Sequence, residues 1–133
     1  MESCQPAAAR LFEMLLNEGA RRGHEVAWWG TSFSIRAHEP GGERKWSFLY
    51  GYTNNQLQFY FVKGAPWSQG EDAAAFRTEL LESGFFLESG RLTLKCTVDE
   101  KNADGLRDLA PRIFTVVESS ISRFQDPDGG SKG

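Results

Sequence analysis

The sequence predicts a single α+β domain in the order α-β-β-β-α-β(β)-α, with an antiparallel sheet of four or five strands packed by three helices. Three observations predict this class. Apolar residues recur every three or four positions near both ends of the chain, as in amphipathic helices. Apolar and polar residues alternate through the middle, as in half-buried strands. Short turn-forming segments separate the alternating stretches, which is typical of antiparallel strands.

The first and last helices are predicted from one-sided apolar patterns. The first covers 6–22 and ends before Gly23, which suits the left-handed conformation of a helix C-cap. The last runs from about 102 to 124, and Pro111 predicts a kink or a restart within it because proline cannot donate to the helical ladder.

The middle helix is predicted over 72–83. Ser68 is followed three residues later by Glu71, and this spacing is typical of a capping box, in which the two side chains bond the free backbone N–H groups of the first turn.

Strands are predicted at 32–37, 45–52 and 57–63, followed by a hairpin made from 85–87 and 91–98. The turns between them fall at 38–43, 53–56 and 89–90. Because the turns after the first two strands are short, the first three strands should form an antiparallel meander.

Length and composition indicate one domain over 1–125 and a flexible tail over 126–133. A chain of 133 residues with 40% hydrophobic and 25% charged residues is long enough to bury its own core. No apolar run resembles a signal peptide or a membrane span, and the two cysteines are Cys4 and Cys96. We therefore expect a reduced, cytoplasmic protein.

The charge pattern disfavours duplex nucleic acid as a direct partner. The net charge is −3, and the basic side chains are spread along the chain rather than clustered. Binding to a phosphate backbone needs a concentrated positive field.

The order of elements is similar to the αβββαβ core of restriction-endonuclease-like nucleases. Those enzymes need a carboxylate on the second strand and an acid-x-Lys triplet on the third, because the carboxylates hold a divalent metal. Here the third strand ends Phe61-Val62-Lys63, with Phe61 in the acid position, and 45–52 holds no carboxylate. The resemblance therefore covers topology and lacks the chemistry.

Other catalytic and metal chemistry has little support in the sequence. The potential zinc ligands Cys4, His24, His38 and Cys96 are scattered, whereas structural zinc sites use closely spaced pairs. The neighbouring pairs His24–Glu25 and His38–Glu39 stand at element ends, where a solvated histidine is ordinary. We expect no cofactor, no metal and no catalytic residues. The alternative is an enzyme with a site that the sequence does not reveal, such as a degenerate nuclease-like or small hydrolase domain.

Aromatic residues are the strongest lead to a site. Ten of the seventeen lie between Trp28 and Phe61. Period-two alternation predicts that Trp46, Phe48, Tyr50 and Tyr52 share one face of their strand. That face either packs against the helices as core, which is the usual place for aromatics, or stays open as a platform for stacking a planar group. The sequence leaves both interpretations open.

The Trp28-Trp29 pair is a second lead to a site. Adjacent residues of an extended segment point in opposite directions, so one of the two should lie at a surface, a pocket rim or an interface. The full set of predicted contact residues is Trp28, Trp29, Arg36, Trp46, Tyr50, Tyr52, Tyr60 and Trp67.

The sequence predicts a non-catalytic binding or interaction module that uses this aromatic-rich sheet face. Its partner would be a small molecule, a peptide or protein, or a second copy of the chain in a homodimer. The similarity to the nuclease topology suggests another alternative, which is a subunit of a bacterial DNA-handling or defence complex.

Overall fold

The computed structural model describes residues 5–28, 31–39, 43–68, 70–90 and 92–132. Within these ranges the chain forms a helix, four strands, a helix, two strands and a final helix, with all strand pairs antiparallel. The predicted α+β class with three helices is therefore confirmed. Cys4, Trp29 and the centre of the turn predicted at 38–43 lie outside the described residues.

The helices are α1 (Pro6–Arg21), α2 (Gly70–Glu82) and α3 (Ala103–Lys132), and a short 3-10 helix, η1 (Pro66–Ser68), precedes α2. Pro111 lies within one continuous helix rather than at a restart. The backbone of 126–132 also belongs to α3, and the flexibility expected of 126–133 stays a prediction.

The capping box expected at the start of α2 does not form. Ser68 belongs to η1, and its buried Oγ has no hydrogen-bond partner in the described part of the chain. The difference arises because Ser68 belongs to η1, a separate turn before α2. Gly70, with a φ of +83°, then redirects the backbone into α2.

The strands are β1 (Glu25–Trp28), β2 (Ser32–His38), β3 (Lys45–Tyr52), β4 (Gln56–Tyr60), β5 (Leu87–Glu88) and β6 (Thr93–Thr97). They form one sheet in the order β1-β2-β3-β4-β6-β5. The sheet is wider than the four or five strands predicted, because Glu25–Trp28 pairs with β2 as an additional edge strand. Its four residues are too few to show the alternation that identifies a strand from sequence.

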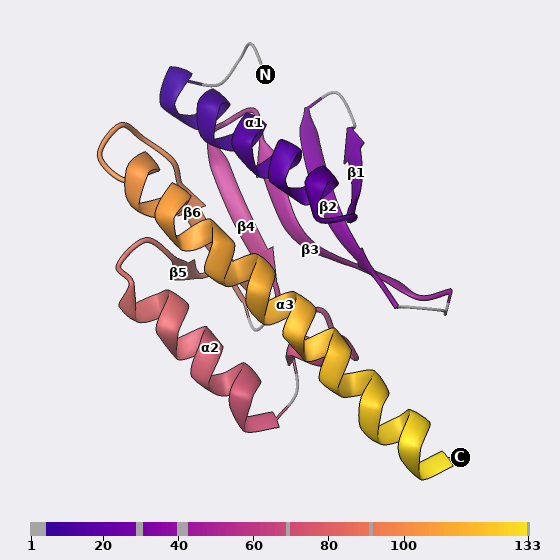
Figure 1. Ribbon diagram of the computed structural model, residues 1–133. Helices are drawn as coiled ribbons and strands as arrows, with labels where there is room; N and C mark the ends of the chain where they lie inside the picture. Colours follow the sequence, from indigo (N-terminus) through magenta and orange to yellow (C-terminus); the bar gives the residue numbers. More distant parts are fainter. Residues whose placement is uncertain (1–4, 29–30, 40–42, 69, 91, 133) are drawn as a thin grey trace.

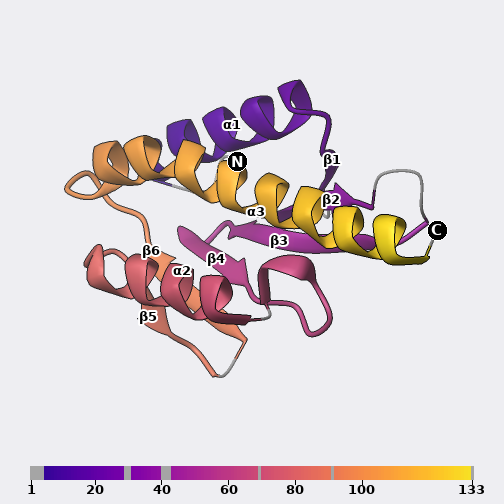
Figure 2. The ribbon, with the colours of Figure 1, turned by 60° about the horizontal axis from the view of Figure 1, so that its bottom comes forward.

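All three helices pack against the same face of the sheet (Figures 1 and 2), and α3 lies between α1 and α2. Each helix places one phenylalanine against a strand phenylalanine. The pairs are Phe12–Phe33, Phe76–Phe59 and Phe114–Phe48, with ring centroids 5.3, 5.7 and 5.8 Å apart. This aromatic layer is the hydrophobic core, and the side of the sheet that it occupies is called the helix face below.

Ion pairs tie α3 to its neighbours at the surface. Arg22, just after α1, places Nη1 2.9 Å from Glu118 of α3, and Arg112 of α3 places Nε 2.9 Å from Glu79 of α2. In the described residues, none of the helices is long and apolar enough to cross a membrane.

Candidate functional site

An irregularity in strand β3 decides which aromatic side chains reach the surface. Ile35 of β2 pairs with Leu49, but the next residue, Arg36, pairs with Ser47. Phe48 is therefore an extra residue, as in a β-bulge, and the alternation of side chains shifts by one beyond it. Phe48 and Leu49 consequently both face the helices and are fully buried.

The bulge divides the predicted aromatic stripe into two groups. Trp46, which is 7% exposed, lies with Phe48 on the helix face. Tyr50 and Tyr52 lie on the opposite face, which no helix covers in the part of the chain that the structure describes, and they are half-buried. The expectation that all four residues share a face is thus corrected: Trp46 and Phe48 are core, whereas Tyr50 and Tyr52 lie on the face opposite the helices.

Tyr60 of β4 completes the group on the second face, called the open face here. The ring centroids of Tyr50 and Tyr60 are 4.7 Å apart, and those of Tyr50 and Tyr52 are 6.3 Å apart with an interplanar angle of 13°. The chain has three tyrosines in all, so the whole tyrosine content is gathered in this one group, the tyrosine cluster. Tyrosine suits a surface of this kind because its ring is apolar and its hydroxyl remains hydrated.

The strand register places polar side chains around the tyrosine cluster. One row of cross-strand partners runs from one edge of the sheet to the other and consists of Leu87, Lys95, Gln58, Tyr50, Ser34 and Ala27. Lys95 makes no ion pair with any described residue, and its ammonium stands two strands away from Tyr50.

A group of charges occupies the end of the open face beside β1. The Glu25 carboxylate lies 3.1 Å from Arg36, 3.0 Å from Lys45 and 3.5 Å from His38. The hydrogen bond from Lys45, opposed in part by desolvation, lowers the pKa of Glu25, and the positive charges of Arg36 and His38 lower it further. Glu25 is the only carboxylate that the described strands place on this face, so the open face carries a net positive charge in a protein with a net charge of −3.

The eight predicted contact residues therefore lie in different places. Arg36, Tyr50, Tyr52 and Tyr60 come together on the open face, whereas Trp29 lies outside the described residues. Trp28 is 52% exposed, but it pairs with Phe33 at the sheet edge, on the helix face, with the two ring centroids 5.9 Å apart.

Trp46 and Trp67 are core residues, which corrects their assignment as contacts. Trp67 is 1% exposed, and its Nε1 donates a hydrogen bond to the Tyr60 carbonyl oxygen at 2.8 Å. Its ring meets that of Trp46 edge-on at 6.0 Å. The sequence does not reveal this, because Trp67 lies between the predicted strand and helix, where no periodic pattern shows which side it faces.

Two surrounding residues were missed. Lys95 stands on the same face as Thr93 and Thr97, an alternation that the sequence does contain, but nothing in the sequence shows that β6 pairs with β4. Ser34 lies within the strand predicted at 32–37, and its pairing with Tyr50 comes from the register.

Two of the groups considered in the sequence, His24 and Cys96, make contacts within the fold. His24 Nε2 lies 2.9 Å from the Glu118 carboxylate of α3 rather than bonding its sequence neighbour, and its ring stacks on Phe114 at 5.7 Å. Cys96 is buried under the helices, and burial raises the pKa of its thiol to about 11, with a smaller contribution from Asp99. A thiol with such a pKa is poorly nucleophilic at neutral pH.

These observations define the class of protein: an α+β domain with three helices on one face of an antiparallel sheet and a basic, tyrosine-bearing opposite face. Comparison with protein-family models, with curated proteins and with solved structures finds no match to the chain.

The contact between the three tyrosines can be tested by pH titration. Burial raises the pKa of Tyr52 above its ordinary value of 10.0, and the hydroxyls of Tyr60 and Tyr50 raise it further. We expect part of the tyrosinate absorbance of the folded protein to rise only above the ordinary pH range of tyrosine, and this part should be missing in Tyr52→Phe. Because the folded state favours the neutral phenol, this contribution to stability is complete below about pH 10 and is lost as pH rises through the folded pKa. A single ordinary step for all three tyrosines would contradict the cluster.

Proposed function

We propose that the protein is a non-catalytic interaction module, and that its open face binds an acidic segment or surface of a partner protein. The observation that carries this proposal is the irregularity at Phe48 in β3. Because of it, Trp46 and Phe48 lie in the core, whereas Tyr50 and Tyr52 lie on the face opposite the helices. The core is complete without the tyrosine cluster.

The composition of the open face supports a protein partner. Tyrosine and arginine are enriched at the centres of protein interfaces, because a rigid amphipathic ring gains contact area at a low cost in conformational entropy. Tyr50, Tyr52 and Tyr60 already touch one another, so their side chains are partly ordered before a partner arrives. Less conformational entropy is then lost on binding.

The charge of the open face supports an acidic partner. Arg36, Lys45 and Lys95 outnumber the single carboxylate of Glu25 on the described strands of this face. Complementary charge increases the association rate and suppresses wrong partners. It also favours an acidic partner over a second copy of the same basic face, which would bring like charges together.

The test is site-specific photo-crosslinking in cells, with p-benzoylphenylalanine introduced at Tyr52 of the full chain. The matched control places the same group at Thr78, an exposed position on α2. We expect a discrete protein adduct from position 52 and none from position 78. The yield of this adduct should fall by about tenfold when Tyr50→Ala removes a central contact or Lys95→Glu reverses a charge.

The other outcomes overturn the proposal in different ways. An adduct with twice the mass of the chain would identify a second copy as the occupant, and an adduct degraded by nuclease would identify a nucleic acid. Equal labelling from positions 52 and 78 would show that the open face has no specific role. Tyr50→Ala should unfold cooperatively with wild-type baselines, and loss of that transition would show that Tyr50 belongs to the core.

A further inference from the structure

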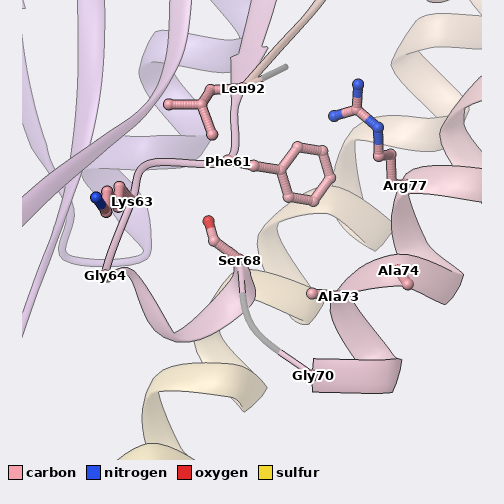
Figure 3. Close-up of a pocket in the computed structure, with 9 residues that line it drawn as sticks. All are labelled: Phe61, Lys63, Gly64, Ser68, Gly70, Ala73, Ala74, Arg77 and Leu92. Atoms are coloured by element: carbon pink, nitrogen blue, oxygen red, sulfur yellow. The ribbon is translucent and has the colours of Figure 1, made fainter.

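A pocket of about 550 Å³ lies between the end of β4 and helix α2 (Figure 3). Its apolar wall consists of Phe61, Leu92, Ala73 and Ala74. The hollow exists because α2 presents two alanines where larger side chains would fill the space. Leu92 is 47% exposed, which is high for a large apolar residue and leaves its side chain available to a ligand.

The walls of the pocket are held in place by the core. The Phe61 ring packs edge-on against Phe59 at 5.0 Å and lies 6.3 Å from Phe76 of α2. On the other side, the hydrogen bond from Trp67 to the Tyr60 carbonyl oxygen fixes η1 to the end of β4. A pocket whose walls are already ordered loses little entropy when a ligand enters.

Two cations stand at the pocket and no acidic residue lines it in the described part of the chain. Lys63 is exposed and forms no ion pair with a described residue. The Arg77 guanidinium lies 5.5 Å from the centre of the Phe61 ring, and its Nη2 is 3.1 Å from Glu88, a carboxylate that is 61% exposed and outside the pocket. A surface pair of this kind is weak, so Arg77 can also bind an anion.

A hydroxyl without a partner lies in the same wall. The Oγ of Ser68 is buried and forms no hydrogen bond with the described residues. Figure 3 shows this hydroxyl directed toward the space between Lys63 and Phe61. An unsatisfied buried hydroxyl costs about 1–3 kcal/mol, and an acceptor atom on a ligand would remove that cost.

We propose that this pocket binds an amphipathic monoanion, with its carboxylate or similar head group beside Lys63 and its apolar body against Phe61 and Leu92. The Ser68 hydroxyl would donate to the same head group. The inference is independent of the function proposed for the open face, because the two sites share no residue.

The experiment titrates the full chain with octanoate and follows backbone amides by two-dimensional NMR. Gly64 and Gly70 line the pocket, and their amide signals should shift with saturation. Octanol and octylamine are the matched probes that lack the anionic head. We expect octanoate to bind at least tenfold more tightly than either of them. Equal binding of octanol would overturn the role of the cations, and absence of saturable shifts at Gly64 and Gly70 would overturn the site.

Variants separate the head-group and apolar contacts. Lys63→Gln should weaken octanoate binding by about tenfold, as expected for the loss of a charged hydrogen bond. Arg77→Gln removes the cation on the other side of the Phe61 ring and should weaken binding less. Ala74→Leu, on an exposed wall position, should abolish binding by filling the pocket. Lys95→Gln removes a cation from the open face and should leave the affinity unchanged. Wild-type affinity in Lys63→Gln would contradict the proposal, whatever the crosslinking experiment shows.

Discussion

Gly51→Ala is expected to destabilise the protein by about 3 kcal/mol or more, which is a large fraction of the stability of a small domain. Gly51 pairs with Phe33 across β3 and β2, and a Cβ at this position would overlap the Phe33 ring. The ring has no room to move, because Phe33 is fully buried and packs against Phe12 at 5.3 Å. Urea unfolding followed by circular dichroism measures the loss.

A double variant gives the matched control for this prediction. Phe33→Leu removes the end of the ring that a Cβ at position 51 would meet, so Gly51→Ala should cost markedly less in that background. Ser47→Ala places an alanine elsewhere on the same strand, where a Cβ is already present, and should change the free energy of unfolding by less than about 1 kcal/mol. Equal costs of Gly51→Ala in the wild-type and Phe33→Leu backgrounds would show that the Phe33 contact is not the cause.

Trp67→Ala is expected to cost about 3–5 kcal/mol through the cavity that it creates, and the unpaired Tyr60 carbonyl adds to this cost. Trp67 is 1% exposed, and its ring lies 5.8 Å from that of Phe48, at the centre of the aromatic layer. The chain would then be close to unfolding at room temperature. The midpoint of thermal unfolding is the measurement.

Trp67→Phe and Trp28→Ala make this prediction specific. Trp67→Phe keeps most of the apolar volume but removes the Nε1 donor, so it should be clearly less destabilising than alanine. Trp28 is 52% exposed, and Trp28→Ala should cost only about 1 kcal/mol. Similar losses in Trp67→Ala and Trp28→Ala would contradict the assignment of Trp67 to the core.

The local patterns predicted the elements of this fold well. The helix predicted over 6–22 is observed as Pro6–Arg21, and the strand predicted over 45–52 is observed at those residues. Both segments have a strong period, 3.6 for the helix and 2 for the strand, and such a period follows from burial of one face. Strand β1 was missed because only Glu25 of its four residues is polar, so the segment shows no alternation.

The candidate site was predictable only in part. Tyr50, Tyr52 and Tyr60 were predicted as contact residues and lie together on the open face, but Trp46, which was grouped with them, is core. A period of two assumes regular pairing, and the extra residue Phe48 breaks that assumption. No residue in 45–52 marks the bulge, because it arises from the pairing with β2 rather than from a local turn signal.

The pocket beside α2 shows the same limit. Lys63 and Ser68 are near each other in sequence, but Arg77 lies in the middle of α2 and Leu92 lies after β5. Their meeting depends on β6 pairing with β4 and on α2 packing over Phe61. These are long-range contacts, and a single sequence carries no signal for them.

The sequence by itself determined the class of the fold, the order of its helices and central strands, and the gathering of aromatic residues in one sheet. These properties follow from hydrophobic periodicity and turn chemistry, which act over a few neighbouring residues. Only the tertiary structure decided that Trp46 and Trp67 are core while Tyr50 and Tyr52 face outward. The physical reason is that the side on which a strand residue lies depends on the register with its neighbour, and one extra residue reverses it.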